Sequence, residues 1–210
     1  MSSDSNLEEG SQLILVVALI VGIGIALLRK GRLQRLADLP FRLGWLALLS
    51  IAAQVYVIYS PASRLELDRP IHAAIMMGSY LALGVVVWVN RRIVGMPIIG
   101  LGLLLNLAVM ASNGGFMPIS REAILAAGTH PANELLVDGS RLDRSKDVLL
   151  PADQTRLWIL SDVIVASKMP LARVYSLGDL IVAVGAFLLL QAAMVPGRET
   201  RSIEREARTG

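Results

Sequence analysis

The sequence predicts an all-α fold: a polytopic integral membrane protein with five transmembrane helices. Two features of the 210-residue chain lead to this prediction. Apolar residues are concentrated in five long stretches that contain almost no charge, and Lys and Arg are crowded between them. As helices, these stretches reach about 24–29 Å, close to the roughly 30 Å of a bilayer's hydrocarbon core. The predicted helices are residues 11–28, 43–60, 71–89, 97–112 and 179–195.

The first apolar stretch is the clearest of the five. It has no charge from Ser11 to Leu28 and is followed at once by Arg29 and Lys30. A run of that length, stopped by basic residues, is typical of a membrane-spanning helix rather than of a soluble core helix. Residues 1–10 are acidic and lack the basic leader of a cleaved signal peptide, so we expect a retained anchor.

Composition narrows the possible function classes. Hydrophobic residues make up 54% of the chain, and the mean hydropathy is +0.60. The absence of cysteine excludes disulfides, thiolate metal sites and CxxC redox chemistry. The net charge of +3 does not indicate nucleic-acid binding, because the basic residues flank apolar stretches, where a role in orientation is sufficient. The expected partner is the lipid bilayer, with another membrane protein as a second candidate and no nucleic acid.

The distribution of Lys and Arg between the five stretches predicts the orientation. Eleven basic residues fall on one side, whereas the other side has only Arg64 and Arg69 in its short segments. The positive-inside rule therefore places the N-terminus outside and the C-terminus in the cytoplasm. The eleven residues are Arg29, Lys30, Arg32, Arg35, Arg42, Arg91, Arg92, Arg198, Arg201, Arg205 and Arg208.

This map divides the chain into five parts. They are an acidic outer tail (1–10), a four-helix membrane region (11–112), an extracytoplasmic cap (113–178), a fifth transmembrane helix (179–195) and a charged cytoplasmic tail (196–210).

Local signals predict order in the cap. Ser120 is a suitable N-cap for a short helix over 121–127, and Gly128 is a suitable stop. Residues 157–166 are apolar but too short to span a membrane, and they include Trp158. We expect this segment to be a helix or strand at the outer headgroup level, with a hairpin dipping into the bundle as the alternative.

Polar and small residues inside the predicted spans indicate how the bundle packs. Gln54, Ser79, Tyr80 and Asn106 reach a similar depth, so they either form interhelical hydrogen bonds or make the floor of a polar pocket open to the outside. Two series of small residues at every fourth position are candidate contact faces. The series are Ala18, Gly22 and Ala26 in the first span and Ala74, Gly78 and Ala82 in the third.

Asn113, Gly114 and Gly115 follow the fourth predicted span. Glycines after an Asn permit positive φ and a sharp exit from the helix, so a helix stop with a turn explains them. The alternative is a loop whose backbone N–H groups and Asn113 side chain bind a ligand at the membrane surface.

Two carboxylates near the fifth span are further candidates. Ser176 and Asp179 fit a capping box, with a proton-relay, ion or ligand role for Asp179 as the alternative. Asp162 lies within an apolar segment and needs a partner, which Arg156, Lys168 or Arg173 would supply in a structural ion pair. The alternative for Asp162 is a catalytic acid, and the sequence leaves its distance from Asp179 open.

The histidines do not indicate a metal site. His72 begins the third span, where its ring is expected to reach water, and His130 precedes a proline in the cap. Two isolated histidines are a poor ligand set, so we expect no metal. No HExxH, Walker, GxSxG or GxGxxG motif occurs, and we expect no cofactor.

Three motifs together resemble a bacterial family of small polytopic membrane proteins catalogued as a domain of unknown function. They are Asn-Gly-Gly-Phe-Met-Pro from Asn113, Leu-Ser-Asp ending at Asp162, and Ser-Leu-Gly-Asp ending at Asp179. The resemblance covers roughly 44–192 and implies a multi-pass protein of the bacterial cytoplasmic membrane. It implies no activity, substrate or cofactor. The family has Gly where this chain has Ser161 and often His where it has Asp147, which weakens a site at either position.

Three classes of function therefore remain open. The first is a non-enzymatic subunit or scaffold that binds a protein or lipid through its outer cap. The second is an interfacial enzyme or lipid/isoprenoid-binding protein that uses Asp162 or Asp179. The third is a small transporter. The candidate ligand-binding residues are Asn106, Asn113, Gly114, Gly115, Asp162 and Asp179.

Overall fold

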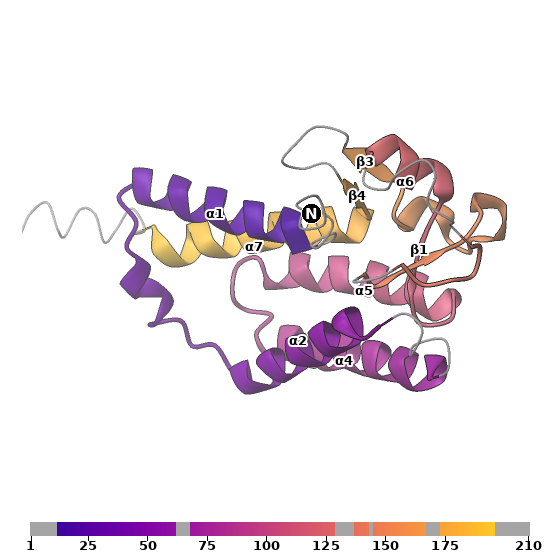
Figure 1. Ribbon diagram of the computed structural model, residues 1–210. Helices are drawn as coiled ribbons and strands as arrows, with labels where there is room; N and C mark the ends of the chain where they lie inside the picture. Colours follow the sequence, from indigo (N-terminus) through magenta and orange to yellow (C-terminus); the bar gives the residue numbers. More distant parts are fainter. Residues whose placement is uncertain (1–11, 62–67, 129–136, 143–144, 167–172, 196–210) are drawn as a thin grey trace, which may run out of the picture.

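The structure is a computed structural model that describes residues 12–61, 68–128, 137–142, 145–166 and 173–195 (Figure 1). The two predicted tails, His130 and Lys168 lie outside these residues. Helices dominate the described part of the chain, which confirms a mostly helical fold.

Five apolar helices form the body of the molecule, and their bounds agree with the predicted stretches to within two residues. Along the arc in which they pack, α2 contacts α4, α4 contacts α5, α5 contacts α7, and α7 contacts α1 (Figure 1). A short 3-10 turn, η2 (Leu33–Leu36), follows α1 and packs on α7. The five helices are α1 (Gln12–Leu28), α2 (Gly44–Tyr59), α4 (Arg69–Val89), α5 (Met96–Ser112) and α7 (Leu177–Met194).

Two of these helices, α4 and α7, are long and apolar enough to cross a membrane. The described apolar parts of α1, α2 and α5 are shorter and have at most 17 residues. By length, the prediction of five spans is therefore supported for two helices.

Glycines allow α5 and α7 to approach closely. A Cβ at Gly102 would lie 2.5 Å from the Gly178 carbonyl oxygen, and a Cβ at Gly185 would lie 2.7 Å from the Ile99 backbone nitrogen. This contact was not predicted, because Gly178 and Gly185 are seven residues apart on α7 rather than four. Such close backbone approach is the usual packing mode of helices in a membrane, where apolar burial alone gives no preference.

The two predicted small-residue series have different outcomes. A Cβ at Gly22 would lie 2.9 Å from the side chain of Leu190, and Ala26 is fully buried, so the first series packs on α7. Gly78 is exposed and has nothing within 4 Å of a Cβ position, so the prediction of a contact face in the third span is wrong within the described structure.

The cap contains short strands that the all-α prediction did not include. Strand β1 (Met117–Ile119) pairs in parallel with β2 (Asp147–Leu149), and β3 (Ile164–Ala166) pairs antiparallel with β4 (Arg173–Tyr175). Each strand has three residues, too few for a recognisable alternation of apolar and polar positions. They form because the backbone groups of a buried connection need hydrogen-bond partners.

Other parts of the cap agree with the sequence. Helix α6 (Arg121–Ala127) begins at Ser120, whose Oγ accepts from the Ala123 N–H at 3.2 Å, and ends at Gly128 with φ 67°. The apolar segment 157–166 contains the 3-10 turn η4 (Trp158–Leu160) and strand β3. A further 3-10 turn, η3 (Ala152–Gln154), precedes it.

Hydrogen bonds from Arg141 connect the cap to the C-terminal end of α2. The guanidinium of Arg141 donates to the carbonyl oxygens of Val57 at 2.9 Å and Ile58 at 2.7 Å, and Arg141 is only 6% exposed. The last carbonyls of a helix lack intrahelical donors, so a buried guanidinium satisfies them and also favours the negative end of the helix dipole.

Candidate functional site

A buried ion pair joins the cap to the helices. Lys146 Nζ lies 3.2 Å from Asp179 Oδ2 and 3.3 Å from Asp179 Oδ1. The two side chains are only 5% and 11% exposed. Lys146 directly precedes β2, and Asp179 lies in the first turn of α7. The pair therefore brings a cap cation onto the start of a bundle helix, where little water reaches it.

Hydrogen bonds from α5 and α7 fix the Asp179 carboxylate. Asn106 Nδ2 donates to Asp179 Oδ1 at 2.8 Å, and Ser176 Oγ donates to Asn106 Oδ1 at 2.9 Å. The predicted capping box is present: the Asp179 N–H donates to Ser176 Oγ at 3.0 Å, and Asp179 Oδ2 accepts from the Ser176 N–H at 3.4 Å. The same carboxylate thus caps α7 and binds Lys146.

Gly178 makes this arrangement sterically possible. A Cβ at this position would overlap the Asn106 side-chain amide and would lie 2.7 Å from the Gly102 carbonyl oxygen. Without a side chain there, α5 can approach α7 closely enough for Asn106 to reach Asp179.

Two more acids lie beside the ion pair on opposite sides of strand β1. Met117 is the register partner of Asp147, and Ile119 forms a parallel bridge with Asp162. The two carboxyls come within hydrogen-bonding reach of each other, and Asp147 Oδ2 also accepts from Ser145 Oγ at 2.6 Å. Both Asp162 oxygens lack a hydrogen-bond donor among the described residues. A proton on one carboxyl of the pair would supply the missing donor.

The electrostatics of this cluster follow from its burial. Burial raises the pKa of Asp162 well above its ordinary value, the Lys146 charge opposes this, and the neighbouring Asp147 adds to it. Burial also raises the pKa of Asp147, against the opposing effect of Lys146. Burial alone would lower the pKa of Lys146, but Asp179 and Asp162 together raise it well above its ordinary value. The surroundings therefore favour the charged form of the lysine and the protonated form of the acids.

A cavity of about 510 Å³ lies inside the arc of helices and ends at this cluster. Its lining comes from α1, α2, α4, α5 and α7 together with Lys146 and with Phe41, which precedes α2. The polar lining residues come from the cap-proximal parts of the helices and from the cap, and apolar residues line the remainder. The polar ones are Gln54, Tyr80, Asn106, Lys146 and Asp179; the apolar ones include Phe41, Ala47, Ile51, Leu83, Met96 and Ala186.

Gln54 contributes an unused donor to this cavity. Its side-chain Nε2 is buried and has no hydrogen-bond acceptor among the described residues. An amide nitrogen without an acceptor in an apolar interior costs free energy, so the position favours a ligand that brings an acceptor.

The structure brings some of the predicted site residues together and separates others. Asn106 and Asp179 share the cluster, and Asp162 lies next to it. Asn113 instead binds the backbone of Arg156, donating to its carbonyl at 2.9 Å and accepting from its N–H at 3.0 Å.

The glycines after α5 form a turn that ends the helix. Gly114 and Gly115 have φ of 80° and 92°, and the Gly115 N–H donates to the Met110 carbonyl at 2.7 Å. A Cβ at Gly115 would lie 2.5 Å from the Ala73 Cβ, so a close approach to α4 also requires this glycine.

Sequence reasoning missed Lys146 and Asp147. It proposed Arg156, Lys168 or Arg173 as the partner of Asp162, whereas the cation with the strongest effect on Asp162 is Lys146. Both missed residues lie in a charge-rich cap sequence, where their burial has no local signal. Only the parallel pairing of β1 with β2 places them in the buried part of the cap, next to the helices.

The expectation that the His72 ring reaches water is wrong. His72 is 5% exposed and stacks on Tyr56, with 6.0 Å between ring centroids. Within the described ranges, no three His, Asp or Glu side chains are placed to hold a metal ion.

Comparison with known proteins identifies one family. The model of the family of unknown function DUF5317 matches residues 38–191, most of the chain and all of the site cluster. Neither a curated protein nor a solved structure matches the chain.

Proposed function

This chain belongs to the family of unknown function DUF5317, and we propose that it is an integral membrane protein that binds a bilayer amphiphile. The apolar chain of the amphiphile occupies the cavity inside the helix arc. Its head group is uncharged and rich in oxygen, and it contacts Gln54, Asn106 and the Lys146–Asp179 pair.

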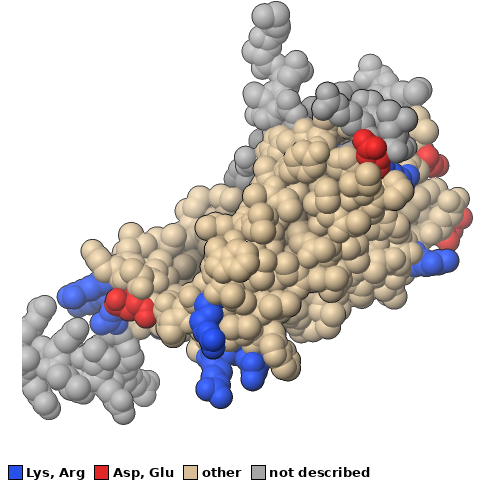
Figure 2. All heavy atoms as spheres, turned by 90° about the horizontal axis from the view of Figure 1, so that it is seen from below, with Lys and Arg blue, Asp and Glu red and all other residues tan. Residues whose placement is uncertain are grey.

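The surface of the molecule supports a membrane location. Figure 2 shows charged side chains near the two ends of one face and a long uncharged region between them. Leu48, Ile71 and Leu104 are 60–70% exposed on three different helices, which is unfavourable in water and favourable in lipid.

Tryptophans mark both ends of this uncharged region. Trp45 and Trp88 are 66% and 67% exposed near the start of α2 and the end of α4, and Trp158 is 47% exposed in the cap. Exposed tryptophans at two levels are typical of the two membrane–water interfaces. With five spans, the positions of the basic residues support an N-terminus outside and a C-terminus in the cytoplasm of a bacterial cytoplasmic membrane. The shorter helices fit by local thinning of the bilayer.

The cavity is the single observation that supports amphiphile binding most directly. It is lined by apolar side chains over most of its length and by amides and an ion pair at one end. This division matches a molecule with a long apolar chain and a small polar head. Lys146 is already neutralised by Asp179 and the acid pair, so the site offers no net positive charge to an anionic head group.

The acid pair does not favour the enzyme hypothesis. Asp147 and Asp162 do not line the cavity, whereas Lys146 and Asp179 do. The two acids therefore lie on the side of Lys146 away from the cavity and position it. A ligand in the cavity would contact the Lys146–Asp179 pair and not the acids. We accordingly place binding before catalysis or transport.

The experiment uses a monoacylglycerol that carries a photoreactive diazirine in its chain, with the purified full-length protein in lipid nanodiscs. Ala186→Phe fills the cavity wall and should lower cross-linking at least tenfold. Ala74→Phe makes the same change on the exposed face of α4 and should leave cross-linking unchanged. Equal labelling of both variants, or none of the wild type, would contradict the proposal.

Gln54→Leu tests the head-group contact. It removes the buried unpaired donor, so the empty protein should become more stable while monoacylglycerol cross-linking falls several-fold. Stronger labelling by a diazirine fatty acid, whose head is anionic, would contradict the predicted head-group chemistry.

A further inference from the structure

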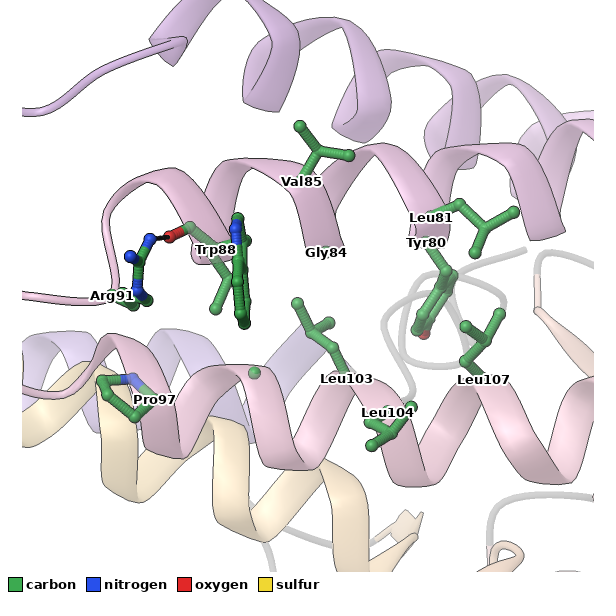
Figure 3. Close-up of a pocket in the computed structure, with 12 residues that line it drawn as sticks. Tyr80, Leu81, Gly84, Val85, Trp88, Arg91, Pro97, Leu103, Leu104 and Leu107 are labelled. Atoms are coloured by element: carbon green, nitrogen blue, oxygen red, sulfur yellow. Dashed lines mark hydrogen bonds between the residues drawn. The ribbon is translucent and has the colours of Figure 1, made fainter.

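A second hollow of about 710 Å³ lies between α4 and α5 (Figure 3). Gly84 on α4 and Gly100 on α5 lack side chains there, and a Cβ at Gly84 would have nothing within 4 Å. The walls are the apolar side chains of Leu81, Leu104 and Leu107. The hollow is therefore largely apolar. We name it the α4–α5 groove.

One end of the α4–α5 groove has a different chemistry. The guanidinium of Arg91 stacks over the Trp88 ring at 4.7 Å, and its Nη1 donates to the Trp88 carbonyl oxygen at 2.9 Å. Figure 3 shows both side chains at the same end of the groove, beyond Gly84. Trp88 is 67% exposed and Arg91 is also exposed. These contacts hold a positive charge over the groove end while leaving it open to the surroundings.

From this arrangement we propose that the α4–α5 groove binds one acyl chain of an anionic phospholipid from the cytoplasmic leaflet, with the phosphate at Arg91. The proposal rests on the membrane location proposed above, and it is independent of the amphiphile in the inner cavity. The basic end of the groove is complementary to the lipid phosphate, and its apolar length is complementary to the acyl chain. Basic side chains at the cytoplasmic membrane surface attract anionic lipids.

The placement of the charge distinguishes the two lipid sites. In the inner cavity, Lys146 is paired with Asp179 and barely exposed, whereas Arg91 is exposed and contacts the Trp88 ring and the Trp88 carbonyl oxygen. The groove therefore selects a negative head group, while the inner cavity selects an uncharged one.

The test uses Trp88 as the reporter. Trp45→Phe and Trp158→Phe leave Trp88 as the only tryptophan, because the chain has three. The protein is reconstituted with phosphatidylglycerol or phosphatidylcholine that carries bromine atoms on one acyl chain, and quenching of Trp88 is measured. We expect brominated phosphatidylglycerol to compete for the Trp88 site about fivefold better than phosphatidylcholine, the preference that one basic side chain provides.

Variants test the contribution of the Arg91 charge and that of the apolar groove separately. Arg91→Gln should abolish the preference, and Arg91→Lys should retain it. Gly84→Leu blocks the groove and should also abolish the preference, whereas Gly78→Leu, on an exposed part of the same helix with open space around it, should not.

Two outcomes would overturn the proposal, and they can be distinguished. Equal quenching by both lipids overturns the anionic-lipid site and leaves the membrane location intact. No quenching by either lipid overturns the site and the membrane location together.

Discussion

Replacing Lys146 by methionine tests the buried cluster most severely. The ammonium lies 3.2 Å from the Asp179 carboxylate, and both side chains are nearly inaccessible. At that separation, Coulomb's law with an effective dielectric constant of about 20 gives an attraction of about 5 kcal/mol. Desolvation offsets most of this in the intact pair. Removing one partner, however, leaves a buried carboxylate without its counter-charge, and such losses cost about 3–5 kcal/mol.

We therefore expect Lys146→Met to lower the free energy of unfolding by about 3–5 kcal/mol. The measurement is detergent-induced unfolding of the purified protein, followed by tryptophan fluorescence. Lys146→Met/Asp179→Asn removes both charges and should recover at least half of the loss. A Lys146→Met variant within about 0.5 kcal/mol of the wild type, the usual range of surface substitutions, would refute the burial of this pair. A double variant less stable than Lys146→Met would refute the electrostatic explanation.

Three further predictions concern stability. Burial raises the pKa of Asp162 in the folded state, so its contribution is complete below an unfolded pKa of about 3.9 and is lost as pH rises through the folded pKa. The free energy of unfolding of the wild type should therefore fall over that rise by up to about 1.4 kcal/mol per pH unit, and melting curves should shift to lower temperature. Asp162→Asn should flatten the dependence; an unchanged slope would speak against a proton on Asp162. Arg141→Ala leaves the last carbonyls of α2 without their donors and should lower the free energy of unfolding by about 2–3 kcal/mol. Arg141→Lys should recover only part of this loss, and full recovery by lysine would exclude the paired hydrogen bonds. Gly178→Ala should lower the free energy of unfolding by about 1–3 kcal/mol, because the new Cβ overlaps Asn106. Gly84→Ala, in open space, should leave it unchanged or raise it slightly. Equal effects of the two variants would contradict the close contact of α5 and α7.

Local features of the fold were predictable because they depend on neighbours in sequence. Long apolar stretches located the five helices, Ser120 and Gly128 bounded α6, and Ser176 with Asp179 formed the predicted capping box. Each depends on periodicity, composition or a side chain within four residues of the group that it satisfies.

The cluster was only partly predictable, because contacts between distant segments create it. Asn106 and Asp179 were recognised as candidates, but 73 positions separate them, and their contact depends on Gly102 and Gly178 at the helix crossing. Lys146 resembles an ordinary solvated cation in the sequence, and only its place before β2 buries it. Asn113, Gly114 and Gly115 stood out for their backbone chemistry, and the structure uses them in a turn.

The most direct test of amphiphile binding is to identify the residues labelled by the diazirine monoacylglycerol after cross-linking and peptide mass spectrometry. We predict labels on Val182 and Ala47, which line the cavity and are partly buried, in excess over Val184 and Leu48, which are exposed on the same helices. Labels mainly on Val184 and Leu48 would mean that the probe contacts only the outer surface, and would contradict a binding site inside the arc of helices.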